Sequence, residues 1–254
     1  MNPTSQPEES PRRPKVSVVI PAFNEERLLP ATLEAVREAS RGFEDRGWDH
    51  EWIVCDNNST DRTAEIAAAA GARVVFEPVN QIGRARNAGA RVATGDWILF
   101  VDADSRPTRE LFADAVAAAS RRDLIAIGST LRLDGGGLSA AIAAEGWNLL
   151  SRLGRLLAGS FIMVDRAAFE AIGGFSLEFY AGEELDLVRR LKSHGKRDQR
   201  RIVVLHQHPL ETSARKVRLY GPLETLGFLL RAVFRPGSIL RNRDSCFLWY
   251  DARR

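Results

Sequence analysis

The 254-residue sequence is poor in cysteine and in long hydrophobic runs. Its two cysteines, Cys55 and Cys246, cannot build a disulfide framework and fit a reducing cytosol. No apolar stretch approaches the roughly 20 residues that span a bilayer, because charged residues interrupt both candidates, 138–150 and 223–233. Residues 1–14 are rich in Pro, Ser, Glu and Arg without an apolar segment, so we expect a disordered leader rather than a secretion signal.

Two phosphate-binding fingerprints are also missing. No Gly-x-Gly-x-x-Gly follows the first predicted strand, and no Gly-x-x-x-x-Gly-Lys-Ser/Thr occurs anywhere. These absences disfavour a Rossmann dehydrogenase and a P-loop NTPase. A phosphorylated ligand would then need a metal ion and arginines, for which Arg84 and Arg86 are the candidates.

Charge is unevenly distributed along the chain. Residues 196–254 hold 13 Lys and Arg against 5 Asp and Glu, whereas the remainder holds 23 against 28. Such a split is typical of contact with nucleic acid or an anionic membrane. The basic part has no nucleic-acid-reading motif, and its arginines are interleaved with apolar residues. This suits a helix on an anionic membrane surface or a basic wall beside a phosphorylated ligand, and equally a solvated face over a core stripe.

The first hundred residues predict a parallel sheet. Short apolar runs at 16–20, 52–55, 72–76 and 97–101 are typical of buried parallel strands, and helical stretches at 25–44, 61–70 and 84–93 lie between them. The cluster at 59–61 supplies capping side chains for the second helix. Strands and helices in alternation indicate an α/β fold with a mostly parallel, Rossmann-like sheet flanked by helices.

The second part is less regular. Helices are predicted at 108–119, from the turn at 134–137 to about residue 157, and at 183–194, with strands at 124–133, 160–164 and 202–206. No long linker separates two folding units. We therefore expect a single domain at 15–210, with halves 15–107 and 108–210, followed by a basic helical extension at 211–254.

Acidic residues follow three of the predicted strands, at the edge where parallel sheets bind ligands. Asp102 and Asp104 could hold a hard divalent cation that neutralises a diphosphate, or form a solvated turn. Asp56 and Glu25 occupy equivalent positions, where acids accept hydrogen bonds from a ribose or a base edge. The simpler interpretation is that Asp56 and Asn58 only form the turn before the next helix.

Two glutamates begin the predicted helix at 183–194. At about 100° per residue, Glu184 falls about 60° from Leu187, on the apolar face, whereas Glu183 falls outside that face. An inward carboxylate at a helix N-terminus stays ionised and can act as a general base. For Glu183 and Asp186 the favoured interpretation is simple complementarity to the helix dipole.

Two histidines alternate near the end of a later strand. His206 and His208 are expected to share one face of that strand. One of them could be a third metal ligand, since imidazole suits Mn better than Mg. A pair of surface histidines is the alternative of equal weight.

Six motifs between about residues 16 and 195 together resemble the family 2 glycosyltransferases with the GT-A fold. They are Val18-Val-Ile-Pro-Ala-Phe-Asn-Glu-Glu26, Val54-Cys-Asp-Asn-Asn-Ser-Thr-Asp61, Ala85-Arg-Asn-Ala-Gly-Ala90, Gly95-Asp-Trp-Ile-Leu-Phe-Val-Asp-Ala-Asp104, Phe169-Glu-Ala-Ile-Gly-Gly-Phe175 and Gly182-Glu-Glu-Leu-Asp-Leu187. The resemblance implies a transferase that moves a sugar from a nucleotide diphosphate donor to an acceptor hydroxyl, usually with inversion.

The resemblance also implies residue roles. Asp104, the last acid of the Asp-X-Asp motif, would ligate Mg or Mn, and Asp102 would lie near the ribose and the metal. The nucleotide-sugar site would comprise Pro21, Phe23, Glu25, Asp56, Asn58, Arg84, Arg86 and Asp102. The family commonly has Glu-Asp where this chain has Glu183-Glu184; the aligned base is Glu184, with Glu183 as the other catalytic candidate.

Three other functions remain open at this stage. Transfer to a polyprenyl phosphate needs no strong base. A sugar nucleotidyltransferase would have a Gly- and Arg-rich loop where this chain has residues 21–25, and a non-catalytic binding module would not depend on Asp104. We expect a UDP-, GDP- or dTDP-linked donor and a glycan, lipid or small-molecule acceptor, without nucleic acid. A cytoplasmic protein of cell envelope or glycan biosynthesis, in peripheral contact with the inner membrane face, fits these features.

Overall fold

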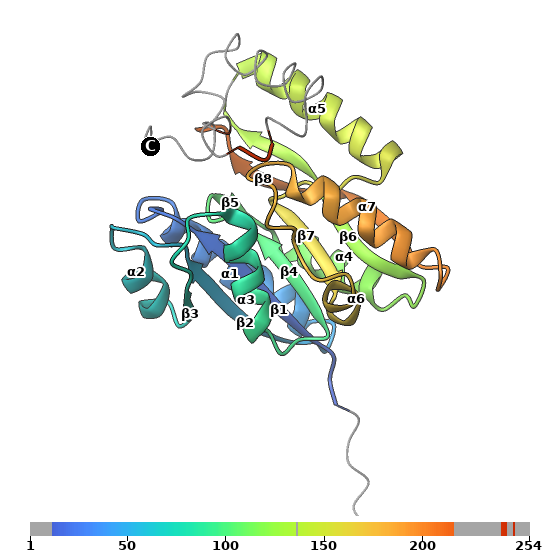
Figure 1. The fold of residues 1–254 in the computed structure, drawn as a ribbon, viewed down its shortest axis with the longest axis horizontal. Helices are drawn as coiled ribbons and strands as arrows, with labels where there is room; N and C mark the ends of the chain where they lie inside the picture. The colour runs from blue at the N-terminus through green and yellow to red at the C-terminus, as the bar shows by residue number, and fades with distance from the viewer. Residues whose placement is uncertain (1–11, 136, 216–239, 243–245, 247–254) are drawn as a thin grey trace, which may run out of the picture.

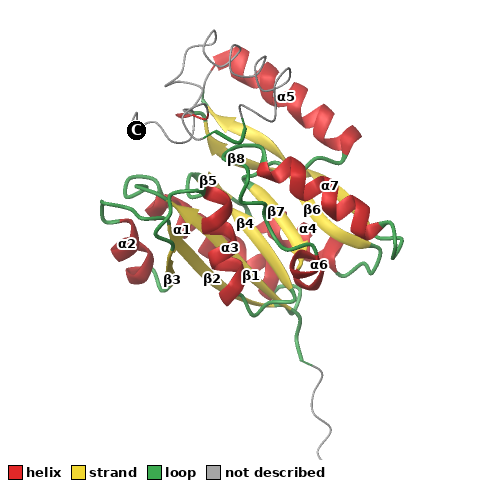
Figure 2. Ribbon diagram, viewed as in Figure 1, coloured by secondary structure: helices red, strands yellow, loops and turns green. Residues whose placement is uncertain are grey.

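A twisted sheet of eight strands organises the computed structural model, which describes residues 12–135, 137–215, 240–242 and 246. The strand order is β3-β2-β1-β4-β7-β6-β8-β5, and helices cover both faces of the sheet (Figures 1 and 2). The predicted α/β fold with a mostly parallel sheet flanked by helices is confirmed. None of the described helices is both long and apolar enough to cross a membrane.

The first half contains the expected β-α-β units. Its parallel strands are β1 (Lys15–Ala22), β2 (Asp49–Asp56), β3 (Arg73–Phe76) and β4 (Trp97–Val101). The connecting helices are α1 (Leu29–Glu44), α2 (Thr63–Ala69) and α3 (Ile82–Val92). β4 is buried along its whole length, as is β1 after its first residue, which explains why their sequences are continuous apolar runs rather than alternating patterns.

The second half adds strands in mixed directions. It comprises β5 (Ser105–Arg106), α4 (Arg109–Ala119), β6 (Leu124–Asp134), α5 (Gly137–Gly154), β7 (Phe161–Asp165), α6 (Arg166–Ala171), α7 (Glu183–Gly195) and β8 (Arg201–Ser213). β7 runs antiparallel between β4 and β6, whereas β6 and β8 are parallel. The short elements β5 and α6 were not predicted, because neither is long enough to show a periodic pattern.

Two cores lie on opposite faces of the sheet. On one face α1 packs against α4, where the rings of Phe43 and Phe112 stack with centroids 4.5 Å apart. A Cβ at Gly42 would lie 2.2 Å from the carbonyl oxygen of Arg109, so only glycine permits this close helix approach. On the other face α3, α6 and α7 cover a second core that includes the contacting rings of Phe100 and Phe175.

Several predicted boundaries are wrong. The helix predicted at 25–44 begins only at Leu29, because Asn24 has a left-handed backbone (φ 52°) and the chain turns there. The N-cap of α2 is Arg62, whose side chain makes no capping bond, although the Asp61 carboxylate accepts from the Thr63 N–H at 3.0 Å. β8 continues to Ser213, past the predicted domain end at 210. Most of the extension at 211–254, and residues 1–11 of the leader, lie outside the described residues.

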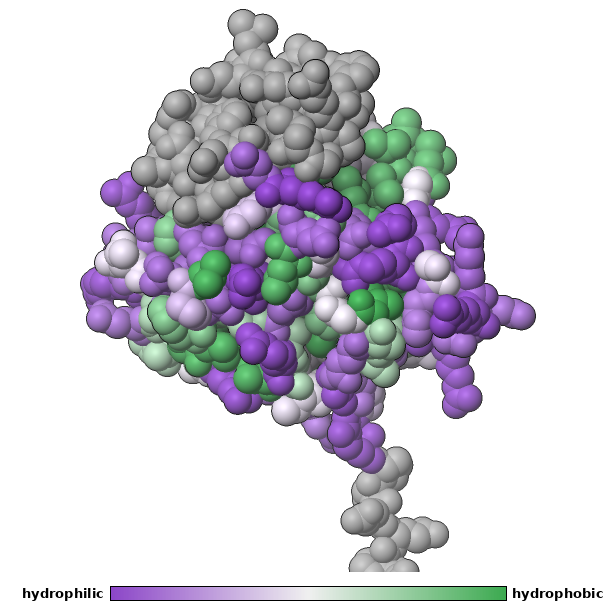
Figure 3. Space-filling model, viewed as in Figure 1, coloured by the Kyte–Doolittle hydropathy of each residue, from purple (hydrophilic) through white to green (hydrophobic). Residues whose placement is uncertain are grey.

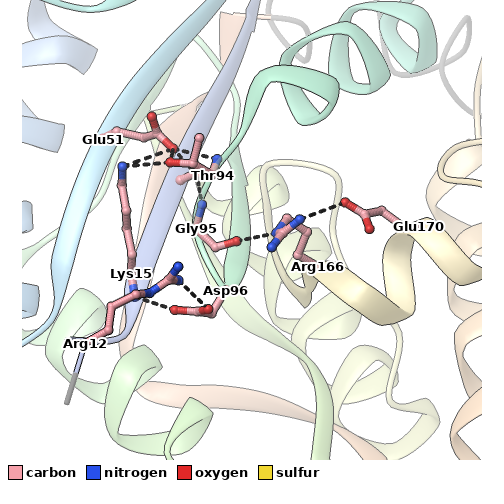
Figure 4. A network of polar contacts seen from close by, with 9 residues as sticks. Arg12, Lys15, Glu51, Thr94, Gly95, Asp96, Arg166 and Glu170 are labelled. Atoms are coloured by element: carbon pink, nitrogen blue, oxygen red, sulfur yellow. Dashed lines mark hydrogen bonds and ion pairs between the residues drawn. The ribbon is translucent and has the colours of Figure 1, made fainter. Parts of the chain in front are cut away.

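A polar network ties the starts of the strands together at the edge opposite their carboxyl ends (Figure 4). Glu51 of β2 accepts hydrogen bonds from Ser17 at 2.5 Å and from the Thr94 N–H and hydroxyl, both at 2.8 Å. Arg166 of α6 donates to the Gly95 carbonyl at 2.7 Å. Partial burial opposes the charge of Glu51, yet these hydrogen bonds hold its pKa below the ordinary value of 4.5.

We expect Glu51→Gln to lower the free energy of unfolding at pH 7 by about 1–2 kcal/mol, because charge-assisted hydrogen bonds to the carboxylate are lost. A depressed pKa stabilises the fold above pH 4.5 and less so as pH falls, so the difference from wild type should shrink in acid. Urea unfolding at pH 7 and below pH 4 measures both effects. A difference that is independent of pH would contradict the assignment.

Candidate active site

A cavity of about 300 Å³ opens at the carboxyl edge of the sheet, and five of the predicted site residues line it. It is lined by the β4–β5 loop, α3, α5, the N-terminus of α7 and the ends of β6 and β8. The charged and aromatic side chains that line it are Arg86, Asp102, Asp104, Trp147, Glu183 and Glu184. Residues as far apart in the sequence as Ile82 and Ser213 thus line one cavity, as the rule for strand ends predicts.

Arg86 is the buried centre of this cavity, with only 1% of its side chain exposed. Its Nη1 donates to Glu183 Oε1 at 2.7 Å, and its Nη2 donates to Asp102 Oδ1 at 3.0 Å and to the Gly159 carbonyl at 2.9 Å. Burial opposes its charge, but Asp102, Glu183 and Glu184 together raise the pKa of Arg86. The arginine therefore remains charged and ties α7 to the β4–β5 loop.

Glu183 is 3% exposed, so the expectation that it lies outside the buried face is wrong. Gly182, with φ 73°, turns the chain so that α7 begins directly at the cavity, where Arg86 binds the first glutamate. The contact with Arg86, rather than the apolar stripe further along α7, decides which way the Glu183 side chain points. Burial and the adjacent Glu184 raise the pKa of Glu183 to about 8, while Arg86 works in the opposite direction.

Glu184 is only partly buried and lines the same cavity. A Cβ at Gly159 would lie 3.7 Å from Glu184 Oε1 and 3.0 Å from Arg86 Nη2, so the glycine makes room for both groups. Unlike Glu183, Glu184 makes no hydrogen bond with Arg86 among the described contacts. Its carboxylate is the one of the pair that a ligand in the cavity can reach.

Asp102 and Asp104 contribute two carboxylates to this cavity from one short loop. Their side chains are 22% and 11% exposed, so both are accessible at the cavity wall. No group of three or more His, Cys, Asp and Glu side chains suited to a metal occurs among the described residues. Two oxygen ligands fit Mg or Mn, which keep several positions for water and phosphate oxygens.

Arg215, just beyond β8, joins two of the predicted site carboxylates. Its Nη1 and Nη2 donate to the two oxygens of Glu25 at 3.0 and 2.7 Å, and Nη2 lies 3.8 Å from Asp104 Oδ2. The loops after β1 and β4 therefore meet at one arginine. Glu25 is thus linked through Arg215 to Asp104, although the two carboxylates follow different strands.

His206 and His208 do not join the site, contrary to the metal-ligand expectation. Between Leu205 and Leu210 the pairing of β8 with β6 shifts register, so the simple alternation of faces is broken there. His208 Nδ1 lies 2.8 Å from the Asp114 carboxylate on α4. His206 lines a separate hollow beside α5.

A family model described as "Glycosyl transferase family 2" matches residues 17–173, which is more than half of the chain. The chain belongs to glycosyl transferase family 2. The matched region includes both Asp102 and Asp104 and ends before α7.

Curated relatives match only in part. An uncharacterized glycosyltransferase of Mycobacterium tuberculosis (strain ATCC 25618 / H37Rv) is 44% identical over 89 residues, which are 35% of this chain and 36% of that protein. A 4,4'-diaponeurosporenoate glycosyltransferase of Staphylococcus haemolyticus is 34% identical over 114 residues, 42% of this chain and 28% of that protein. The aligned regions thus span about a third of these relatives.

Solved structures share the fold over more of the chain. Glucosyl-3-phosphoglycerate synthase of M. tuberculosis, in complex with Mn2+, UDP-glucose and phosphoglyceric acid, is 27% identical with a TM-score of 0.59, covering 87% of this chain and 77% of that one. A mannosyltransferase of Pyrobaculum calidifontis with GDP-Man and Mn2+ has a TM-score of 0.63 at 19% identity and covers 94% and 70%. The second likeness shows the fold alone.

The remaining nucleotide-site candidates of this family 2 chain lie around the ends of β1 and β2. Pro21 and Asp56 are buried and Phe23 is half-buried, and the Asp56 carboxylate accepts from the Ser59 N–H at 3.0 Å. Asn58 is exposed with a φ of 66°, so it serves the turn. Arg84 lines a different hollow.

Three functional candidates were missed in the sequence. Asn57 is buried, donates to the carbonyls of Glu77 and Val79 at 3.2 and 2.6 Å, and thereby positions the segment that leads into α3. Trp147 lines the cavity, and its buried Nε1 has no hydrogen-bond partner in the described part of the chain. Only Asn57 had a sequence signal, since it directly follows a buried strand; Trp147 and Arg215 depend on tertiary contacts.

Glu183 gives this site a measurable pH dependence. Its folded-state pKa of about 8 lies above the ordinary value of 4.5, so it stabilises the fold at low pH and this contribution is lost as pH rises towards 8. We expect Glu183→Gln to remove that part of the decline in unfolding free energy between about pH 5 and 8. Urea unfolding in EDTA measures it.

The exposed Glu178→Gln, whose carboxylate is 66% exposed, is the matched control and should keep the wild-type pH profile. Identical pH profiles for Glu183→Gln and wild type would show that Glu183 is not the titrating group.

Proposed function

We propose that this chain transfers a sugar from a nucleotide diphosphate donor to an acceptor hydroxyl, with inversion at the anomeric carbon. The observation that carries the proposal is the single cavity in which the Asp102–Asp104 pair faces the accessible carboxylate of Glu184. The family membership and the likeness to a UDP-glucose-binding synthase support it. A nucleotidyltransferase and a non-catalytic module have no comparable observation in their favour.

The donor side lies at the ends of β1 and β2. Pro21 and Asp56 sit at adjacent strand ends, where the β1–β2 register pairs Pro21 with Cys55 and Ala22 with Asp56. Phe23 and Glu25 follow in the next loop, and we assign these four residues, Pro21, Phe23, Glu25 and Asp56, to the nucleoside. A diphosphate extending from there reaches the loop that carries Asp102 and Asp104.

Asp104 and Asp102 would hold a divalent cation. Such an ion, when bound, neutralises negative charge on the diphosphate. The fit rests on the chemistry of the pair, two oxygen ligands at an accessible cavity wall. The Mn2+ bound by the similar glucosyl-3-phosphoglycerate synthase supports this assignment.

Arg86 acts as a positioning residue rather than as a direct phosphate ligand. Both of its terminal nitrogens are occupied by Asp102, Glu183 and Gly159, and it is almost fully buried. Arg215, with 23% of its side chain exposed, is the cation we assign to the diphosphate. It would exchange its contacts with Glu25 for the donor's phosphate oxygens.

The reaction would be a single displacement. The acceptor O–H gives its proton to the Glu184 carboxylate, and its oxygen forms a bond to the anomeric carbon from the face opposite the diphosphate. The bond between that carbon and the diphosphate oxygen breaks, and the oxygen keeps the electron pair. We assign the base to Glu184 rather than Glu183, because Glu183 is buried and its Oε1 accepts from Arg86 Nη1 at 2.7 Å.

The cysteines agree with the cytoplasmic location that we propose. Both Cys55 and Cys246 are buried, and neither forms a disulfide. Burial raises the pKa of Cys55 to about 12 and that of Cys246 to about 11, so neither is a reactive thiolate at neutral pH.

We expect Glu184→Gln to reduce turnover by about 100-fold to 10,000-fold, the usual contribution of a general base, and to leave nucleotide affinity unchanged. Product formation from a radiolabelled donor and nucleotide binding by calorimetry measure the two quantities. Glu178→Gln, outside the cavity, is the control that should retain both. Turnover that survives Glu184→Gln would instead favour attack by a phosphate oxygen, as in transfer to a polyprenyl phosphate.

A thermal-shift screen of UDP, GDP and dTDP, each with and without Mn, tests the donor site. We expect one nucleotide to raise the melting temperature by several degrees only when the metal is present, since ligand binding stabilises the folded state. Asp104→Asn should abolish the metal-dependent part. No shift with any of the three nucleotides would count against the whole proposal.

A further inference from the structure

Helix α5 carries its large apolar side chains on the side that faces away from the protein. Ile142 is 64% exposed, Leu149 59% and Leu153 76%, and at about 100° per residue they lie within about 40° of one another. The buried side instead contains Asn148 and Ser151, which are 7% and 1% exposed. This pattern is the reverse of an ordinary surface helix, whose apolar side faces the core.

Polar contacts hold α5 in place. Asn148 accepts from the Leu131 N–H at 2.8 Å and donates to the Leu131 carbonyl at 2.9 Å, and Ser151 donates to the Asn148 carbonyl at 3.0 Å. The two bonds of Asn148 fasten the helix to β6, and the Ser151 bond lies within α5. The outward leucines are therefore not what attaches α5 to the domain, and their replacement should leave the fold intact.

A hollow of about 470 Å³ lies beside this stripe, between α5 and the strands β6 and β8. Leucine and valine side chains form much of its lining, and four arginines also line it: Arg121, Arg152, Arg155 and Arg201. No acidic residue is among the described residues of this lining. Asp123 pairs with Arg121 and Arg201 at 3.1 and 2.9 Å, whereas Arg152 and Arg155 are exposed beside the leucines.

The arrangement is visible on the surface. Figure 1 places α5 at one end of the molecule, and Figure 3 shows a green apolar patch there, next to purple hydrophilic residues. The apolar stripe of α5 and the exposed Arg152 and Arg155 thus form one continuous surface, which we call the α5 face.

We propose that the α5 face binds an anionic lipid bilayer. The outward leucines would enter the headgroup region, and the arginines would contact lipid phosphates, which is the chemistry of a helix lying on a membrane surface. Charge decides between this occupant and the alternatives. A second copy of the chain would bring the same arginines together, which is unfavourable. Residues 216–239 are also basic and would repel these arginines, since they contain Lys216, Arg218, Arg231 and Arg235 against Glu224 alone.

Docking in this way would place the cavity beside the bilayer, because Trp147 of the same helix lines it. A lipid-borne acceptor would then reach the site without leaving the membrane. That consequence rests on the proposed transferase function, whereas the lipid contact itself does not.

Sedimentation of the full chain with phosphatidylcholine vesicles, with and without phosphatidylglycerol, tests the proposal. We expect binding only to the anionic vesicles, weakened by added salt. Leu149→Ser/Leu153→Ser should reduce binding about tenfold or more, and Arg152→Ser/Arg155→Ser by roughly fivefold for each arginine. Phe76→Ser, which removes an exposed apolar side chain on β3 (60% exposed), is the matched control and should bind like wild type.

Unchanged melting temperatures would show that the variants fold, and vesicle binding does not require turnover, so this test is independent of the transferase assay. Three results would overturn the proposal. These are no binding of the wild-type chain to anionic vesicles, equal binding by the α5 variants, and a wild-type dimer that Leu149→Ser/Leu153→Ser converts to a monomer in sedimentation velocity.

Discussion

The ion pairs of one buried guanidinium hold the candidate site together. Arg86 projects from α3 and binds Glu183 at the start of α7, Asp102 after β4 and the Gly159 carbonyl before β7. Removing one partner of a buried, hydrogen-bonded charge pair typically costs about 3–5 kcal/mol, because the remaining charge is left uncompensated in a medium of low polarity. The positions of Asp102 and Glu183 therefore depend on the same side chain.

The two edges of the sheet have different tasks. At the strand starts, Glu51, Thr94, Gly95 and Arg166 form a closed network in which the polar groups satisfy one another (Figure 4). At the carboxyl ends, carboxylates gather around one cavity, and Arg86 and Arg215 pair with several of them among the described residues. A ligand that binds the folded chain there stabilises it further. Polar contacts at the strand starts thus stabilise the fold, whereas the carboxyl ends carry the candidate site.

The helix wheel of α7 shows where sequence patterns stop being informative. It placed Glu184 inward with the leucines and Glu183 outward, yet Glu183 is the buried one. Periodicity describes a helix packed along its length, but the first turn of α7 contacts α3 and the β4–β5 loop instead of the core. The histidines illustrate the same limit, since a register shift in β8 separates His206 from His208, and nothing in the local sequence announces it. Similarly, α5 is apolar enough to look like a core helix, whereas its leucines face outward.

The sequence by itself determined the α/β class, the alternation of the first four strands with helices, and the placement of acidic residues at the strand ends. Short-range periodicity and the geometry of parallel sheets decide those features. The sequence also determined which residues carry the family's motifs. Tertiary structure alone decided that Arg86 is a buried positioning group, that Arg215 joins Glu25 to Asp104, and which of two adjacent glutamates is accessible. Those outcomes depend on contacts between segments distant in the sequence, where burial and competing charges, rather than local preference, set the energy.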